Sequence, residues 1–392
     1  MRGLVALPGE LKRDAKLLMA MATIGSLIGG VLGCILQLYL KSIGFDARII
    51  GLLSMVNIVS MAVFSIPFGV LGDRYGRRNM MIVGGAAFDF SFILLIATRS
   101  LPLLSLSFLL LGLGNASFNV LLFPLYASYF DEGKLEEAFG LMNFMSLTAS
   151  SLGSLLGLIP PTLTKLRGLT LSYAYWILLT TSALLLVPVS IALILVRPDE
   201  PVGGSKMRLR SRNVILRFAM MSAILGLGAG LFINLIPYYL SVKFKVESDA
   251  VGVVLFATNV ASAFANLFAA HLSQSLGVFR GILATLGLVA PLYLGVILSP
   301  LFPLAAALYV IRTSLMSVYA TLILALLMRM TEDEERATAN SVTSLIDSLL
   351  RGVGSAIGGG LMALNLDLPG LISVTLYASA IPAFYLLFRE QG

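Results

Sequence analysis

Long runs without a single charged residue constrain the fold of this chain more than any other feature. They cover residues 17–40, 49–72, 101–130, 138–164, 168–196, 218–242, 250–270 and 368–388. An α-helix needs about 20 apolar residues to cross the hydrocarbon core of a bilayer. Charged residues make up 12% of the 392 positions, whereas a soluble domain is about 25% charged. The sequence therefore predicts an integral membrane protein built from α-helices.

Four further segments complete the predicted set of spans. Residues 79–98 and 337–366 are long enough, although a few charged residues interrupt them. Residues 281–328 are too long for one helix, and the prolines of SPLFP at 299–303 divide them into two. The sequence thus predicts twelve transmembrane helices.

Lys and Arg are distributed unevenly over the loops between these helices. If the N-terminus is cytoplasmic, the cytoplasmic segments hold 18 of the 27 basic residues and the outer loops hold 7. Basic residues favour the cytoplasmic side, so we expect a protein of the cell (inner) membrane with both termini in the cytoplasm. The polar start, MRGLVALPGELKRDAKLL, is not typical of a signal peptide. The net charge of +7 then reflects topology and does not indicate a nucleic-acid partner.

Residue types that carry metal or covalent chemistry are scarce. The chain has one cysteine, Cys34, and one histidine, His271, which excludes an intramolecular disulfide and a Cys or His metal cluster. It contains no P-loop, no Gly-rich dinucleotide motif and no Ser/His/Asp or Cys/His set. We therefore expect no enzyme activity, no cofactor and no metal. The expected partners are the lipid bilayer, a small-molecule substrate and protons.

The two halves of the sequence repeat at one constant offset. A shift of 201 residues superimposes Gly25 on Gly226, Gly29 on Gly230, Gly51 on Gly252, Gly76 on Gly277, Pro102 on Pro303, Gly153 on Gly354 and Gly157 on Gly358. We expect an N-terminal six-helix bundle at 1–196, a central cytoplasmic linker at 197–212 and a C-terminal six-helix bundle at 213–392. Such repeats are common in secondary transporters, which hold their substrate near the middle of the membrane.

The segment GVLGDRYGRR at residues 69–78 lies in the turn between the second and third predicted helices. It fits the loop signature G-x-L-[AG]-D-R-x-G-R-[RK] at every fixed position, and the chain thereby resembles the major facilitator superfamily. The second-half counterpart, AHLSQSLGVFR, keeps Gly277 but has Gln274 in place of Asp73. The resemblance implies an all-α polytopic membrane fold of two pseudo-symmetric six-helix bundles, working as a monomer.

This loop carries the residues of a conformational latch in the family that the chain resembles. Gly69 and Gly76 permit a close helix approach and a tight turn. Asp73 is suited to a helix N-terminus, where its charge meets unsatisfied N–H groups. The resemblance implies that this helix begins near residues 337–340, and that the contact holds in one state of the transport cycle only.

The remaining members of the predicted latch are Arg74, Arg77 and Arg78. The resemblance implies that Arg77 ties Asp73 to an acidic group such as Asp131 or Glu132. Alternatively, the three arginines mark only the cytoplasmic side of the membrane. The alternative explains the arginines but not the Asp and the glycines, so we prefer the latch.

Charged residues within the predicted spans are costly, at roughly 2.5–3.5 kcal/mol each near a helix centre. Asp347 and Arg351 stand four residues apart, in the order that favours an ion pair. We expect Arg312 to meet them near mid-membrane. Since one carboxylate does not neutralise two guanidinium groups, the set favours an anionic substrate at Arg312 and Arg351, or proton exchange at Asp347. The alternative is a purely structural network between helices.

Polar residues also occur on the helices that line the cavity of the family that the chain resembles. They are Gln37, Asn115, Asn119, Asn234 and Tyr238. We interpret them as substrate-binding groups, with interhelical hydrogen bonding as the alternative. Asp89, on a peripheral helix, is a second candidate for proton coupling, and we expect it to bond to Asn57 or Ser60.

These features predict a secondary active transporter that moves a small organic solute, with an anionic group, by alternating access. We expect proton coupling, and we favour export over uptake. The alternatives are a uniporter or importer of organic anions, a flippase of lipophilic molecules, and a non-transporting receptor with the same fold. A receptor should have lost the latch and the buried charges, and a flippase should have a more apolar cavity.

Overall fold

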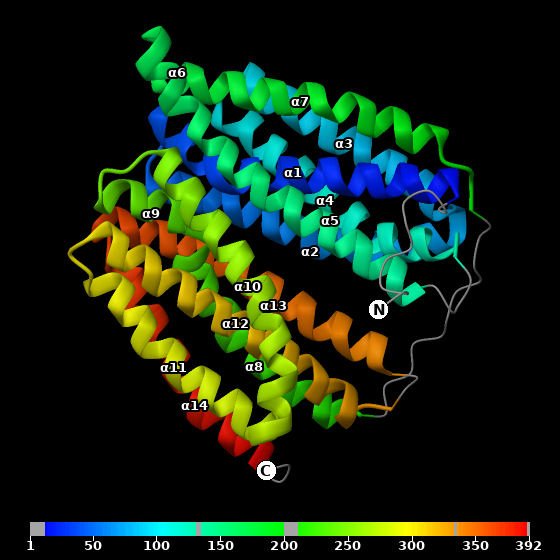
Figure 1. The fold of residues 1–392 in the computed structure, drawn as a ribbon, viewed down its shortest axis with the longest axis vertical. Helices are drawn as coiled ribbons and strands as arrows, with labels where there is room; N and C mark the ends of the chain where they lie inside the picture. Colours follow the sequence, from blue (N-terminus) through cyan, green and yellow to red (C-terminus); the bar gives the residue numbers. More distant parts are fainter. Residues whose placement is uncertain (1–11, 131–134, 200–210, 333–334, 390–392) are drawn as a thin grey trace, which may run out of the picture. The chain divides into compact units, whose positions relative to one another are not determined.

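The structure, a computed structural model, describes residues 12–130, 135–199, 211–332 and 335–389. Over these residues the chain is helical and contains no strand. Figure 1 shows the helices in chain order. They are α1 (Arg13–Ser42), α2 (Ala47–Tyr75), α3 (Arg77–Ala97), α4 (Leu101–Ala127), α5 (Leu135–Leu155), α6 (Ile159–Arg167), α7 (Leu171–Leu195), α8 (Arg212–Phe232), α9 (Ile236–Lys243), α10 (Ser248–Leu276), α11 (Val278–Leu298), α12 (Phe302–Met330), α13 (Arg336–Leu364) and α14 (Leu368–Phe388).

The chain divides into two compact units. The first comprises Met1–Ile43 and Val56–Ser205, and the second comprises Gly44–Met55 and Lys206–Gly392. Helix α2 contributes to both, because its first residues group with the second unit. The domain boundaries expected from the sequence stay a prediction.

The helix boundaries repeat between the two halves at the offset that the glycines indicate. Helices α2 and α10 are both 29 residues long, and α3 and α11 are both 21 residues long; in each pair the second starts 201 residues after the first. Gly76 and Gly277 precede α3 and α11 with φ of +90° and +78°. Both turns use a backbone conformation that favours glycine. The expected pair of six-helix repeats is thus confirmed.

Between α1 and α8, the first helices of the two halves, the repeat offset differs by one residue from the offset in the other helices. A Cβ on Gly30 would overlap the carbonyl oxygen of Ser150, and a Cβ on Gly230 would overlap that of Arg351. Gly30 therefore corresponds to Gly230. The predicted match of Gly29 with Gly230 is wrong, because Gly29 faces open space.

Two membrane spans are interrupted, and they do not correspond in the repeat. A short 3₁₀ segment, Leu156–Leu158, separates α5 from α6 just before Pro160 and Pro161. Another, Ile233–Leu235, separates α8 from α9 just before Pro237. Proline lacks the N–H group that would continue the helical hydrogen bonds. Each break thus follows directly from the local sequence.

Within the described residues, eleven helical segments are long and apolar enough to cross a membrane. Helix α13 is not among them, although its 29 residues exceed the length of a span. It carries Asp347, Arg351 and many Ser, Thr and Asn side chains. The chain is an integral membrane protein, and α13 is its most polar long helix.

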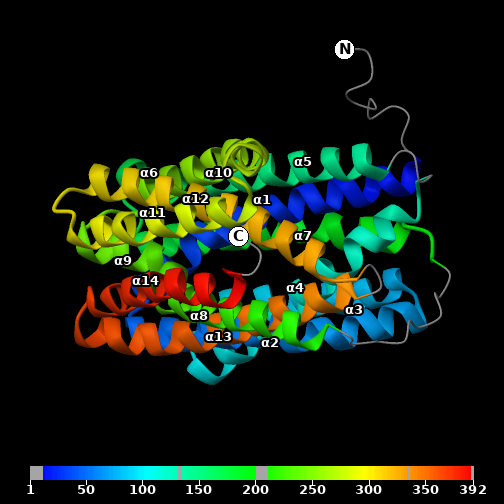
Figure 2. The ribbon, with the colours of Figure 1, turned by 90° about the horizontal axis from the view of Figure 1, so that it is seen from below.

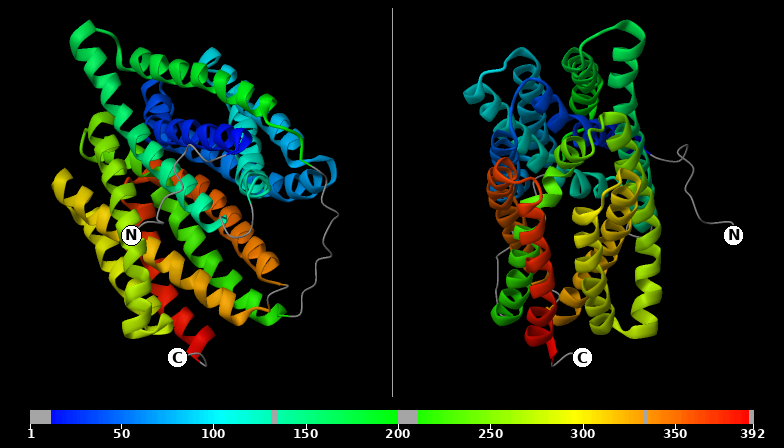
Figure 3. Two further views of the ribbon diagram at one scale, coloured as in Figure 1. Left: turned by 45° about the vertical axis from the view of Figure 1, so that its right-hand side comes forward. Right: turned by 90° about the vertical axis from the view of Figure 1, so that its left-hand side faces the viewer.

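Packing within each unit follows the small residues of the helices. In the first unit α1 packs against α5 and α7, and α3 packs against α4 and α7 (Figure 2). In the second unit α8 packs against α13 and α14, while α12 packs against α10 and α11 (Figure 3). Glycines permit the closest approaches, as at α1 with α5 and α8 with α13.

Candidate functional site

A cavity of about 650 Å³ opens in the second unit among helices α8, α12, α13 and α14. This volume is in the range of small-molecule binding sites, about 300–1,000 Å³. Three charged residues line it: Arg312 from α12, and Asp347 and Arg351 from α13. The cavity therefore brings together the intramembrane charges that the sequence predicts to meet.

Helix α13 forms the polar wall of the cavity. Its lining residues are Asn340, Thr343, Ser344, Asp347, Ser348 and Arg351. Their spacing of three and four residues places them on one face of the helix. The walls from α8, the 3₁₀ segment after it and α12 are mainly apolar, with residues such as Phe218, Leu225, Ile233, Met316, Ile323 and Leu327. A ligand with a polar end and an apolar body fits such a cavity.

Asp347 and Arg351 form the predicted ion pair on the polar wall. Arg351 Nε donates to Asp347 Oδ2 at 3.1 Å, and Nη2 donates to Oδ1 and Oδ2 at 3.1 and 2.9 Å. Their side chains are 30% and 34% exposed, respectively. The pair is thus bidentate and accessible from the cavity, which makes the geometry specific.

Two glycines on α8 allow the backbone of this pair to approach. A Cβ on Gly226 would lie 2.7 Å from the carbonyl oxygen of Asp347, and a Cβ on Gly230 would overlap that of Arg351. Helix α8 therefore packs directly against the backbone of the polar wall.

Arg312 is buried and its guanidinium lies against two aromatic rings. Its side chain is 3% exposed, and its Cζ lies 4.8 Å from the ring centroids of both Tyr293 and Tyr377. Its Nε and Nη2 have no hydrogen-bond partner among the described residues. The cation–π contacts stabilise the charge by about 0.5–2 kcal/mol each. They leave two buried N–H donors unsatisfied, each costing about 1–3 kcal/mol.

The sequence reasoning missed the tyrosines and most of the polar wall. Tyr377 and Tyr319 line the cavity together with Arg312. The periodic Ser, Thr and Asn residues of α13 were a usable signal, because they recur on one helical face. The stacking of Tyr293 on Arg312 joins α11 to α12, and no local pattern predicts a contact between separate helices.

Two of the predicted substrate-binding residues lie in the second unit but do not line this cavity. Asn234 falls in the 3₁₀ break after α8, and its Nδ2 donates to Ser355 Oγ on α13 at 2.9 Å. Tyr238 is half-buried on α9. Their roles as substrate-binding groups stay predictions, and Asn234 also has a structural contact.

Three further predicted residues belong to the first unit. Gln37 on α1 and Asn115 on α4 are half-buried, whereas Asn119 on α4 is exposed. The Nδ2 of Asn119 lies 3.4 Å from the Sδ of Met61. Their roles as substrate-binding groups also stay predictions.

Asp89 bonds to a different helix from the one expected. Ser190 Oγ on α7 donates to Asp89 Oδ2 at 2.6 Å. Asn57 and Ser60, the predicted partners, donate instead to backbone carbonyls of α4. The prediction was wrong because α3 packs against α7 and α4. A role of Asp89 in proton coupling stays a prediction.

The turn of the predicted latch is closed by a residue that the sequence analysis did not single out. Asp199 Oδ2 accepts a hydrogen bond from the backbone N–H of Arg77 at 2.9 Å, and Oδ1 accepts one from that of Arg78 at 3.0 Å. These N–H groups belong to the first turn of α3, which has no partner for them within the helix. Asp199 therefore caps α3 from the segment that follows α7.

The arginines of this turn bind mainly within the first unit. Arg77 Nη2 donates to Asp73 Oδ1 at 3.3 Å, and its Nη1 donates to the carbonyl of Pro124 at 3.2 Å. Arg78 Nη2 donates to the carbonyl of Ile194 at 2.5 Å. Arg74 lies over the ring of its neighbour Tyr75.

Three expectations about the latch have different outcomes. Asp131 and Glu132 lie outside the described residues. The contact of Asp73 with residues 337–340 joins the two units and stays a prediction. Gly69 does not make the expected close approach, since a Cβ there would meet Val120 at an ordinary 3.5 Å. Gly72 lies closer, because a Cβ there would overlap the side chain of Leu121.

Tyr129 fixes the same region just beyond α4. Its hydroxyl donates to the carbonyl of Arg197 at 3.0 Å. Burial raises the pKa of the Tyr129 phenol, and the nearby carboxylates of Asp14 and Asp199 add to the effect. The phenol therefore stays neutral and serves as a hydrogen-bond donor.

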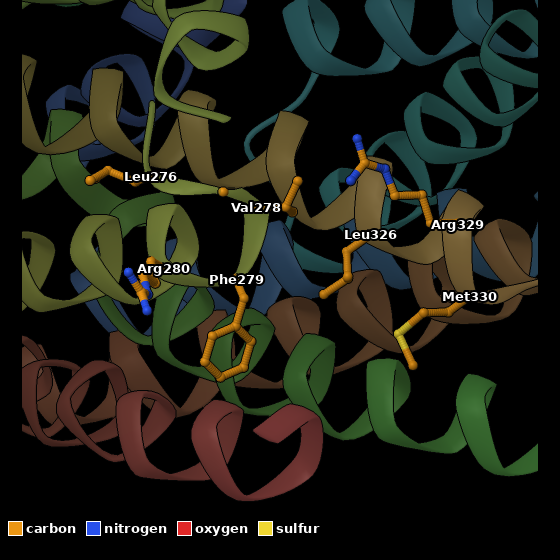
Figure 4. Close-up of a pocket in the computed structure, with 8 residues that line it drawn as sticks. Leu276, Val278, Phe279, Arg280, Leu326, Arg329 and Met330 are labelled. Atoms are coloured by element: carbon orange, nitrogen blue, oxygen red, sulfur yellow. The ribbon is translucent and has the colours of Figure 1, made fainter. Parts of the chain in front are cut away.

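The equivalent turn of the second unit borders a cavity of about 320 Å³. Figure 4 shows its lining, with Arg280 and Arg329 on opposite sides and Val278 and Leu326 between them. Both arginines are exposed. Gln274 stands here in place of Asp73, so the turn keeps its glycine but not its acidic residue.

The repeated helices, the two units and the charged cavity define a polytopic membrane protein of the transporter type. The family model of the Major Facilitator Superfamily matches residues 17–222 and again 218–392. The chain therefore belongs to this superfamily of membrane transporters, as its loop motif predicts.

Solved structures agree with this assignment at the level of the fold. The chain is similar to a bacterial homologue of the human lysosomal transporter Spinster in an inward-facing, occupied conformation, with a TM-score of 0.78, 15% identity and 96% of each chain covered. It is also similar to the nucleoside transporter NupG, with a TM-score of 0.78, 11% identity, and 96% of this chain and 100% of that chain covered. A bacterial metal transporter matches with a TM-score of 0.73, 14% identity, and 96% and 99% covered. A comparison with curated proteins found no match.

Proposed function

We propose that this protein is a secondary active transporter that moves a small organic anion across the cell (inner) membrane by alternating access, coupled to protons. Membership of a transporter superfamily supports the class of activity. The substrate, the coupling and the orientation with both termini in the cytoplasm are parts of the proposal.

The observation that carries the proposal is Arg312. Its guanidinium is buried beside a cavity of ligand size, and two of its N–H donors have no partner among the described residues. An anionic group of a ligand would satisfy both donors through charge-assisted hydrogen bonds. A strut that only joins helices would leave them unsatisfied.

Asp347 is the proposed proton carrier. It is the one carboxylate among the described residues that line the cavity, and about a third of its side chain is exposed. Ionisable residues within membrane spans commonly form proton relays. Its carboxylate is also the ion-pair partner of Arg351.

Two alternatives fit the cavity less well. A flippase of lipophilic molecules would have no use for three charged side chains, which are costly in a membrane. A non-transporting receptor has no need of the ordered turn at residues 69–78, in which Asp199 caps α3.

Transport by purified protein in liposomes tests the proposal. Radiolabelled organic acids, phosphates, sugars and cationic drugs should be compared, after a thermal-shift screen has selected those that stabilise the protein. We expect uptake of organic anions that depends on a pH gradient. The sequence favours export over uptake. Assays with the pH gradient in either direction decide between the two. Transport of cations or sugars alone would contradict the proposal.

A further inference from the structure

The cavity of about 320 Å³ beside the turn between α10 and α11 lies at the end of two membrane spans. Helix α11 begins at Val278 and helix α12 ends at Met330, and both residues line the cavity. The end of a span lies where the hydrocarbon core of the bilayer meets the lipid headgroups. In the proposed orientation this is the cytoplasmic surface of the membrane.

Two arginines give this cavity its charge. Arg280 and Arg329 are exposed, and neither has a hydrogen-bond or ion-pair partner among the described residues. They lie on opposite sides of the cavity (Figure 4). Because both side chains are long and exposed, they can turn toward one anion between them. The other described lining residues include no acid; they are Leu276, Gly277, Val278, Phe279, Leu326 and Met330.

The equivalent turn of the first unit already contains an anion. The carboxylate of Asp199 accepts the backbone N–H groups of Arg77 and Arg78, and a Cβ on Gly76 would lie 3.4 Å from Asp199 Oδ1. At the offset of 201 residues the counterpart is Gly277, where a Cβ would meet nothing within 4 Å. No described side chain caps α11. The start of α11 is therefore open where the start of α3 holds a carboxylate.

The two arginines of the cavity are specific to the second repeat. Arg280 and Arg329 correspond to the neutral residues Asn79 and Ser128 at the same offset. The counterparts of the three arginines in the first turn are neutral in turn: Ser275, Val278 and Phe279. In the first turn, Arg77 and Arg78 bind the carboxylate of Asp73 and backbone carbonyls. Arg280 and Arg329 have no such acceptor, so an anion from outside the chain suits them.

The chemistry of the lining selects the kind of anion. A phosphate binds well to arginine and to the N–H groups that begin a helix. The apolar residues between the arginines favour an anion that also carries an apolar body. A zwitterionic headgroup would bring an ammonium group close to two guanidinium groups, without a carboxylate among the described lining residues to receive it. A phospholipid whose only charge is its phosphate avoids this repulsion.

We propose that this cavity binds one anionic glycerophospholipid from the surrounding membrane. Arg280 and Arg329 bind its phosphodiester, the open N–H groups at the start of α11 add to this contact, and the glycerol and acyl chains lie against the apolar lining. Basic pockets between transmembrane helices at the cytoplasmic side commonly bind anionic headgroups. The site goes beyond the proposed function, because the described residues that line it are all different from those that line the cavity of Arg312.

Native mass spectrometry of the purified full-length protein in a neutral detergent tests this proposal. The probes are dioleoylphosphatidylglycerol, dioleoylphosphatidylcholine with the same acyl chains, and glycerophosphoglycerol, the anionic headgroup without acyl chains. We expect saturable binding of one phosphatidylglycerol, at least about tenfold tighter than that of phosphatidylcholine, because two basic residues contact the anionic headgroup. Glycerophosphoglycerol should bind much more weakly, since it has no apolar body.

Single variants locate the site. Arg280→Gln and Arg329→Gln should each weaken phosphatidylglycerol binding by about fivefold or more, the effect of one basic residue. Neither should change the binding of phosphatidylcholine or the melting temperature. Arg212→Gln removes an exposed arginine at the start of α8, on the same side of the membrane, and should keep the binding. If a variant does not fold, the comparison of the two lipids on the unmodified protein still decides.

Three outcomes would overturn the proposal. Phosphatidylcholine binding as tightly as phosphatidylglycerol would show that the cavity does not select an anionic lipid. Glycerophosphoglycerol binding as tightly as the lipid would indicate a site for a soluble phosphate. An equal loss of binding in Arg212→Gln would show a general attraction to surface charge. All three leave the proposed transport of organic anions untouched, because that depends on Arg312.

Discussion

Asp199 caps the first turn of α3 by accepting a hydrogen bond from the backbone N–H of Arg78 at 3.0 Å, across 121 residues of sequence. Its second carboxylate oxygen accepts the N–H of Arg77. The segment that leaves α7 is thus attached to the turn between α2 and α3. Hydrogen bonds to the backbone therefore fasten this end of the first unit.

Removing this cap should destabilise the first unit. Asp199→Ala leaves the two N–H groups without their acceptor, and loss of a helix cap costs about 0.5–2 kcal/mol. Asp199→Asn keeps one acceptor oxygen and should cost less. Thermal melting of both variants in detergent measures the difference. Equal melting temperatures for Asp199→Ala and the unmodified protein would show that the cap contributes nothing.

The close contact between α8 and α13 gives a second prediction. Gly230→Ala places a methyl group against the carbonyl of Arg351, so we expect a loss of about 1–3 kcal/mol from overpacking. Gly29→Ala is the matched control, because Gly29 is its partner in the sequence repeat but faces open space. Thermal melting should show a lower transition for Gly230→Ala only. Comparable losses in both variants would contradict the displacement of the repeat by one residue in these helices.

The sequence predicted the fold in detail because its signals are local. Charge-free length marks each span, and the constant offset of Gly76 and Gly277 marks corresponding turns. The match of Gly29 with Gly230 failed because a glycine in sequence register need not be the one at the contact. In α1 the contact with α5 is made one residue later, at Gly30.

The sequence predicted the charged residues of the site but not the residues that surround them. A charge within a span needs a partner, which made Arg312, Asp347 and Arg351 conspicuous. Asp347 and Arg351 pair within one helix, so their spacing was enough to predict the contact. The tyrosines that stack on Arg312 come from other helices, and only the three-dimensional packing shows them. The same reason explains why Ser190 was not foreseen as the partner of Asp89.

The latch motif gives a prediction about transport. Asp73→Asn removes a charge that Arg77 contacts at 3.3 Å. Since the proposed contact of Asp73 forms in one conformational state only, the variant should fold and insert normally but transport much more slowly. Initial transport rates in liposomes, normalised to folded protein, measure this effect. Normal rates in well-expressed protein would show that the motif only marks the cytoplasmic side of the membrane.

Asp347→Asn should separate exchange from net transport. A side chain that binds no proton cannot couple substrate movement to a pH gradient, whereas exchange of bound substrate across the membrane requires no net proton movement. We therefore expect loss of transport driven by a pH gradient and retention of substrate exchange. Transport driven by the gradient and substrate exchange are both measured in the same liposome preparation. The substrate concentrations inside and outside the liposomes are varied. Failure to recover folded protein would instead indicate that Asp347 and Arg351 form a structural network.

Arg312 carries the last prediction, because the proposed anion site depends on it. Arg312→Lys keeps the positive charge but loses the planar edge formed by Nε and Nη2, which Lys does not reproduce. We expect binding of the organic anion to weaken by about 1.5–3 kcal/mol, the contribution of one charge-assisted hydrogen bond. Arg312→Gln removes the charge as well and should weaken binding further.

The stability of these two variants decides between a ligand-binding group and a strut. Arg312 has unsatisfied donors in the unliganded protein, so replacing it removes a cost as well as its contacts with Tyr293 and Tyr377. Melting temperatures should therefore change much less than affinities. Arg48→Gln, at an exposed position, controls for the loss of one charge. Unchanged affinity together with a collapse of melting temperature in both variants would show that Arg312 is a strut.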